Sequence, residues 1–189
     1  MIQLLCEELA QEIRKANIVW LAGGLASAWK YNDSKKHTKA VYWDYARKEH
    51  VNLVPDAERH AMVYFEERGA TQLQEPRLGQ KYKADLVLIG WVNTRFGVVT
   101  PYLIEQLQKV FKSPINTTTF SQVMVRFTEL LPEGEQLFSR YDYDAGVKKY
   151  LQKPYDAFGL RMSVSFTVCV PADYQTPRQF DDSFNNSFT

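Results

Sequence analysis

The chain has 189 residues, with 23 Lys and Arg against 22 Asp and Glu, and 45% of its residues are hydrophobic. This composition supports one domain with a substantial core, and the net charge of +1 excludes a global field that draws the whole protein onto nucleic acid or a membrane. Aromatic residues at 14% favour a sheet-rich fold over a helical bundle.

The N-terminal stretch is predicted to be an amphipathic helix over residues 2–15, since apolar side chains recur there at helical spacing. Interspersed glutamates exclude a signal-peptide core, and the most apolar run, residues 86–92, is too short to span a bilayer. We therefore expect a soluble protein made in the cytoplasm. Cys6 and Cys169 are predicted to be core or near-core thiols of a reducing compartment, although the sequence leaves a disulfide between them open.

Helical periodicity ends at residues 17–31, where Gly23 and Gly24 are predicted to form a break between segments. A polar loop over residues 32–39 follows, and a strand is predicted over residues 40–45. The loop and its flank carry a basic cluster that could touch phosphates, although a solubilising surface loop is the simpler reading. This cluster consists of Lys30, Lys35, Lys36 and Lys39.

Two further strands are predicted over residues 61–69 and 81–93. The second is apolar on both alternating faces, so we expect it at the centre of a sheet with both faces covered. A second helix is predicted from Thr100, as N-cap, with Pro101 in its first turn. Its buried stripe is predicted to be Leu103, Leu107, Val110 and Phe111.

The last strands are predicted over residues 120–132 and 160–171, where apolar and polar side chains alternate. A turn is predicted around Pro154, Tyr155 and Asp156. Short polar turns join most strands, so the fold class predicted is α+β. The sheet is expected to be mostly antiparallel, with two helices packed on one face.

Catalytic and metal-binding patterns are weak. His37, His50 and His60 lack ligand spacing and are predicted to be surface residues. Asp142 and Asp144 could form a carboxylate site that binds metal ions. The alternative is structural: Asp142 occupies an exposed strand position, and Asp144 caps a helical turn. We therefore expect no enzyme, no cofactor and no metal.

The chain ends in "RQFDDSFNNSFT", where three phenylalanines recur every fourth residue among polar side chains. In an extended segment, positions four apart share one side, so Phe180, Phe184 and Phe188 could enter successive pockets. We predict that residues 1–171 form the α+β domain and residues 172–189 an extended arm that docks on another subunit or partner. A disordered end is the alternative.

The order of elements, with "KADLVLIGWVNTRF" before the second helix and "LQKPYDAFGLRMSVSFTVCV" near the end, resembles the tail-terminator and tail-completion proteins of tailed bacteriophages. The resemblance implies a non-catalytic subunit of a ring in the virion, at the junction of neck and tail. Its partners are then copies of itself, neighbouring neck, tail-tube or connector proteins, and transiently the passing DNA, with no membrane. It also implies that the basic cluster faces the lumen or an adjacent ring.

Two alternatives come from other classes of protein. A monomeric cellular adaptor would present its sheet or its phenylalanine-rich end to a single partner. A small hydrolase would need a deep pocket that holds the carboxylates near residue 142.

Overall fold

The computed structural model describes residues 1–19, 21–30, 38–55, 57–69, 72–75, 81–131, 137–138, 140–141 and 152–168. They form an α+β fold, as predicted, in the order α1 (Ile2–Ala16), β1 (Leu21–Leu25), β2 (Ser27–Lys30), β3 (Thr38–Asp44), β4 (Glu49–Asn52), β5 (Ala61–Glu67), β6 (Gln72–Glu75), β7 (Lys81–Asn93), η1 (Thr94–Phe96), α2 (Thr100–Val110), β8 (Phe120–Leu131) and β9 (Tyr155–Val168).

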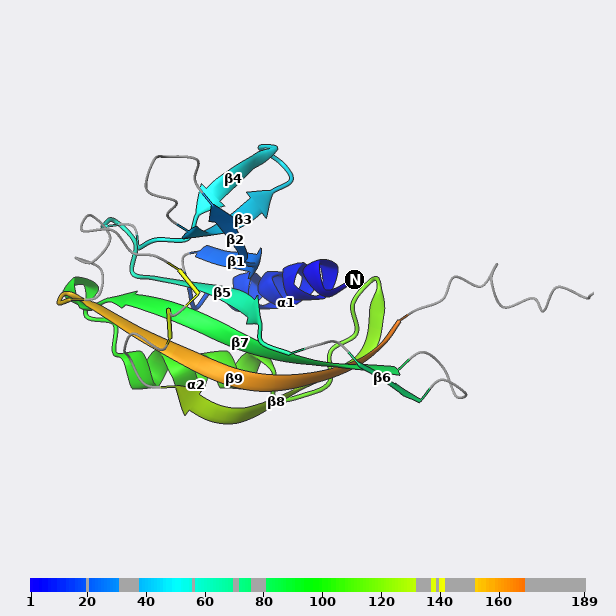
Figure 1. Cartoon of the computed structure of the whole chain (residues 1–189). Coiled ribbons are helices and arrows are strands. Elements are labelled where there is room, and N and C mark those ends of the chain that lie inside the picture. Colours follow the sequence, from blue (N-terminus) through cyan, green and yellow to red (C-terminus); the bar gives the residue numbers. More distant parts are fainter. Residues whose placement is uncertain are drawn as a thin grey trace, which may run out of the picture.

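The large sheet has the strand order β1-β5-β7-β9-β8, and β6 extends it beside β7. All its pairings are antiparallel except that of β1 with β5. Strand β7 is central, as predicted, and pairs with β9 along its whole length, from Lys81 opposite Thr167 to Asn93 opposite Tyr155. This long β7–β9 ladder is the axis along which the molecule extends (Figure 1).

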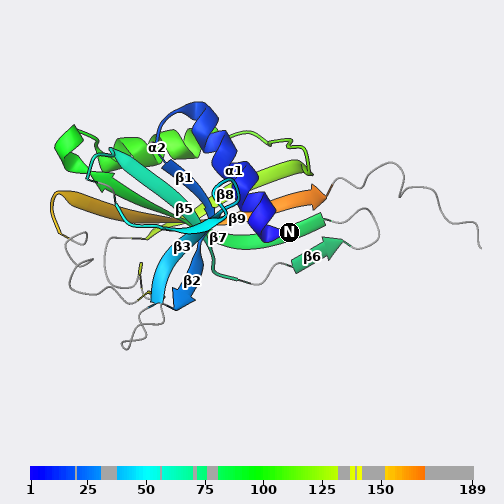
Figure 2. The same cartoon turned by 90° about the horizontal axis from the view of Figure 1, so that it is seen from above.

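Both helices pack on one face of the large sheet, which confirms the prediction (Figure 2). Leu5, Leu9 and Ile13 of α1 are fully buried against this face. Leu103 and Leu107 of α2 join the same core cluster. Burial of each such side chain contributes about 1.5–3 kcal/mol relative to exposure, so this layer provides much of the apolar stabilisation.

A second sheet, with strand order β2-β3-β4, lies beside β1 at one edge of the large sheet and was not predicted as a sheet (Figure 1). It contributes to the core on the face that the helices leave open. Its residue Ala40 belongs to the second core cluster, together with Trp91 of β7. Phe138 also covers this face, because its ring stacks on Trp91 with centroids 4.5 Å apart. The two faces of β7 therefore contact two separate cores, which explains its unbroken apolar run.

Three local predictions need correction. Gly23 and Gly24 lie inside β1, which pairs with β5, rather than at a break. Glycine fits at position 24 because a Cβ there would lie 2.8 Å from both Glu7 and Tyr42. The second helix has Val99 as its N-cap, since the hydroxyl of Thr100 donates to Asp156 instead. The turn predicted at residues 154–156 ends before Tyr155, where β9 already begins.

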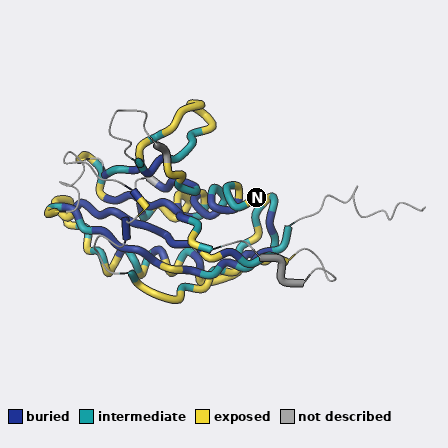
Figure 3. The backbone as a smooth tube through the Cα atoms, viewed as in Figure 1, coloured by how far each residue is buried: buried dark blue, intermediate teal, exposed yellow. Residues whose placement is uncertain are grey.

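The elongated shape gives the molecule two ends. One end holds the C-terminus of α1, the start of β5, η1 and the start of α2. The opposite end holds Met1, β6 and Val168, the last residue of β9 (Figure 1). Burial is concentrated along the middle of the large sheet, while the β3–β4 hairpin and the outer side of α2 are exposed (Figure 3).

Candidate functional site

Most of the residues singled out from the sequence lie outside the described part of the chain. This holds for Phe180, Phe184 and Phe188, for Lys35 and Lys36, and for His37, Cys169, Asp142 and Asp144.

The basic cluster is described at two positions. The β2–β3 register places Lys39 opposite Trp29, and Lys30 opposite Thr38, so the two lysines are diagonal neighbours at one end of this antiparallel pair. The side chain of Lys39 is half-buried. The backbone therefore places these two members of the cluster in successive cross-strand pairs, at positions that alternate between the two faces of the small sheet.

The described histidines lie on the surface, as predicted, and each contacts an aromatic ring. His60 stacks on Phe96 with ring centroids 4.3 Å apart, and His50 meets Trp43 edge-on at 4.8 Å. Cys6 is buried in α1, and burial raises the pKa of its thiol. Within the described ranges, no group of three or more His, Cys, Asp or Glu side chains could hold a metal ion.

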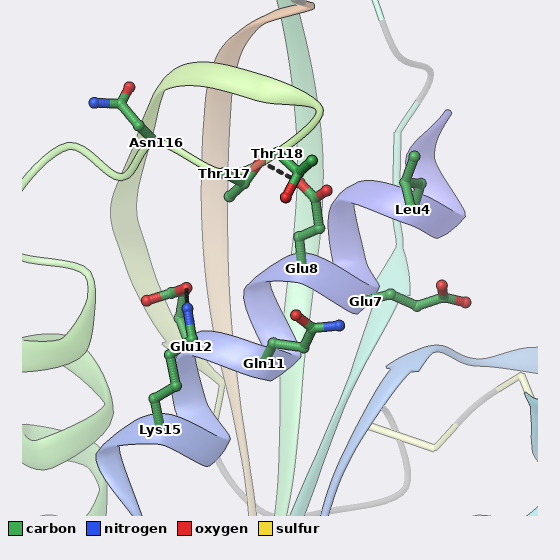
Figure 4. A pocket seen from close by; sticks show the side chains of 9 residues that line it. All are labelled: Leu4, Glu7, Glu8, Gln11, Glu12, Lys15, Asn116, Thr117 and Thr118. Atoms are coloured by element: carbon green, nitrogen blue, oxygen red, sulfur yellow. Dashed lines mark hydrogen bonds and ion pairs between the residues drawn. The ribbon is translucent and has the colours of Figure 1, made fainter. Parts of the chain in front are cut away.

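An acidic groove runs along the outer side of α1, beside the loop that precedes β8 (Figure 4). Glu8 accepts a hydrogen bond from the hydroxyl of Thr117, and Glu12 pairs with Lys15. Glu7 accepts from Gln3 at 2.7 Å. Since these carboxylates already have partners within the chain, the groove is explained as a packing contact between helix and loop.

A charged cluster lies on β5, where the sheet meets residues 137–141. Glu66 is fully buried, and its Oε2 lies 2.7 Å from Nη2 of Arg68. Arg68 also donates to the carbonyl of Leu137, and Arg140 donates to the carbonyl of Glu67. Burial raises the pKa of Glu66, while the hydroxyl of Tyr141 and the two arginines oppose this rise. These contacts attach Leu137, Arg140 and Tyr141 to the sheet.

A further depression lies at the α2 end of the molecule, and we name it the end pocket. It has a volume of ≈ 420 Å³. The C-terminal end of α1 and the start of α2 form its walls, so residues far apart in sequence meet there. It is lined by Asn17, Ile18, residues 97–99, Tyr102, Leu103 and Gln106.

The rim of the end pocket is apolar and accessible. Tyr102 is 62% exposed, Val99 60% and the adjacent Phe96 42%. Val99 and Tyr102 meet at this pocket, and exposed apolar side chains that cluster on a surface mark candidate interaction sites.

Hydrogen bonds fix the backbone that carries this rim. Thr94 donates to the carbonyl of Pro154 through both its amide, at 2.8 Å, and its hydroxyl, at 2.7 Å. Asn93 caps η1 by accepting from the amide of Arg95. Gly97 then closes the turn with φ 71, a left-handed conformation that glycine adopts at little cost. The pocket is therefore formed before any partner arrives.

Sequence reasoning missed the end pocket. The segment between β7 and α2 has the signal of a loop and a helix cap, and Tyr102 lies off the predicted buried stripe. The sequence does contain one signal: apolar residues surround the start of α2, where polar residues are usual. These residues are Val98, Val99 and Tyr102.

A scan against models of protein families and a search of curated proteins both find no match. Statements about function therefore depend on this chain's own residues. Of the described helices, neither is long and apolar enough to cross a membrane.

Proposed function

We propose that this chain is a non-catalytic structural subunit of a tailed-bacteriophage virion, assembled head to tail into a ring at the neck or tail junction. The proposal starts from the resemblance in element order to tail-terminator and tail-completion proteins. Its fold class agrees with that resemblance, since two helices cover one face of a mostly antiparallel sheet.

The observation that carries the proposal is the difference between the two ends of the molecule. One end presents exposed Val99 and Tyr102 at the end pocket, and exposed Phe96 on the preceding η1. At the opposite end, Met1 and Leu4 are exposed beside the acidic groove. A two-fold dimer needs one self-complementary patch, whereas a head-to-tail contact joins two different surfaces and closes into a ring when the rotation permits.

The charge of the chain suits a channel for DNA. A net charge of +1 gives no strong attraction to phosphates, so DNA can pass through a ring without being held. The end of the β2–β3 pair, with Lys30 and Lys39, is the part that we assign to the lumen. Lysines in the lumen would make weak, salt-sensitive contacts with the phosphates of the passing DNA.

Native mass tests this function. Light scattering after size exclusion should give one discrete oligomer of the full chain, and negative-stain electron microscopy should show rings with a central channel. Mass spectrometry of purified phage particles from the source host should detect the chain in fixed stoichiometry. A stable monomer at every concentration, together with absence from particles, would contradict the proposal and favour an adaptor that binds one partner.

A further inference from the structure

We propose that the end pocket binds the C-terminal segment, residues 172–189, of a second copy of this chain, with a phenylalanine side chain inserted beside Tyr102. This inference rests on the proposed ring and names the contact that links its subunits.

The pocket has the size and chemistry for an aromatic side chain. Its volume of ≈ 420 Å³ lies within the roughly 300–1,000 Å³ of small-ligand sites, and its floor includes the buried side chain of Leu103. Val99 and Tyr102 offer apolar area around the opening, which water covers when the pocket is empty. An inserted aromatic ring removes that area from water and gains about 1.5–3 kcal/mol.

The C-terminal segment supplies matching groups. Phe180, Phe184 and Phe188 recur every fourth residue, and Asp181 and Asp182 lie between the first two of them. The mouth of the pocket lies at the N-terminal end of α2, where the helix dipole favours a carboxylate. Arg95, exposed on η1 next to Phe96, adds a positive charge at this end of the molecule.

The direction of the chain favours a second copy over the same copy. Strand β9 starts at the pocket end with Tyr155 and leaves Val168, 13 residues later, at the opposite end. The two ends are therefore roughly 43 Å apart along this strand. Phe180 follows Val168 by 12 residues, which reach at most about 43 Å when fully extended and leave no length for passing around the domain. Phe184 and Phe188 follow Val168 by 16 and 20 residues and could reach either copy's pocket, so this limit on reach applies to Phe180 alone. In a head-to-tail contact, the start of the segment instead lies close to the neighbour's pocket.

A photo-crosslinking experiment on the full chain tests this contact. A benzoylphenylalanine replaces Phe184, and isotopically labelled and unlabelled chains are mixed before irradiation. Mass spectrometry should find crosslinks from position 184 to residues 94–106, in pairs of mixed label. Crosslinks that lie elsewhere, or only within one chain, would overturn the proposal.

Two substitutions supply a matched pair. Tyr102→Asp should lower the crosslink yield about ten-fold, since ten-fold corresponds to 1.4 kcal/mol of lost contact. Tyr45→Asp, at a site that is 60% exposed in the β3–β4 turn, should leave the yield unchanged. Both positions are exposed, so circular dichroism should show folded proteins. Equal yields in the two variants would overturn the pocket as the binding site.

The outcomes separate this inference from the proposed function. Rings that persist when Phe180, Phe184 and Phe188 are all replaced by Ser, with no crosslink at the pocket, would overturn the inference and keep the ring. Crosslinks between chains at the pocket in a protein that forms no ring would support the inference and contradict the proposed function.

Discussion

Glu66 lies on β5, and Arg68 is the first residue after this strand. The carboxylate of Glu66 is fully buried, and its Oε2 lies 2.7 Å from Nη2 of Arg68. The ion pair sits where the arginine also holds the carbonyl of Leu137. A buried carboxylate costs free energy unless its charge is compensated, so Arg68 both compensates Glu66 and ties Leu137 to the end of β5.

The stability of the protein should fall as pH rises because of Glu66. Burial raises its pKa above the ordinary value of 4.5, so the folded state holds the proton more tightly than the unfolded state. Its contribution to stability is fully present below the ordinary value and is lost as pH rises through the raised pKa. Urea unfolding between pH 4 and pH 8 should show the wild type losing stability relative to Glu66→Gln. Parallel pH profiles would contradict this assignment.

Arg68→Ala should destabilise the protein by about 3 kcal/mol at pH 8, because it leaves a buried carboxylate without its cation. The same substitution in the Glu66→Gln background should cost less, since no buried charge remains. Arg161→Ala is the control: its ion pair with Glu129 is half-exposed on both sides and should contribute at most about 1 kcal/mol. Urea unfolding of these variants measures all three free energies, and equal costs for Arg68 and Arg161 would refute the role of the buried pair.

The close approach of Phe158 to Gly90 gives a test of the core. Phe158 lies directly opposite Gly90 in the β7–β9 ladder, and a Cβ on Gly90 would lie 2.2 Å from the Phe158 ring. Gly90→Ala should therefore cost about 1–3 kcal/mol or more through overpacking. A Cβ on Gly23 meets its nearest atom at 3.5 Å, so Gly23→Ala should be well tolerated.

A double-mutant cycle identifies the cause of that cost. Phe158→Leu removes the clashing ring, so Gly90→Ala should be less destabilising in this background than in the wild type. Chemical unfolding of the four proteins gives the coupling energy. Strictly additive effects would show that the Phe158 ring is not what excludes a side chain at position 90.

The elements with local signals were predictable from sequence. The bounds of β7 coincide with the prediction, and α1 and β8 differ from it by one residue, because periodicity and turn residues mark them in the chain itself. Strand β1 was not predicted: its two glycines give no strand signal, and it forms because it pairs in parallel with β5, far along the chain. Of the second sheet, β3 was predicted, as the strand over residues 40–45. Strands β2 and β4 were missed because they have only four residues each and depend on pairing with β3.

The candidate site was less predictable than the fold. The phenylalanine-rich end was singled out because its aromatic residues recur in a polar segment, and its role as a binding segment stays a prediction. The end pocket could not, since it exists only where the end of α1 meets the start of α2, and Asn17 and Tyr102 are distant in sequence. A pocket that depends on tertiary packing leaves only weak traces in local patterns.

Gly97 should be important for the shape of the end pocket. Its φ of 71 lies in the left-handed region, while no heavy atom lies within 4 Å of an added Cβ, so a substitution acts through the backbone and not through a clash. Gly97→Ala should cost roughly 1–2 kcal/mol, whereas Gly97→Asn should cost less because asparagine tolerates this conformation. Thermal unfolding compares the two variants, and crosslinking from position 184 should be weaker for the alanine variant. If alanine and asparagine behave alike, the turn is free to relax, and the pocket does not depend on a fixed backbone at Gly97.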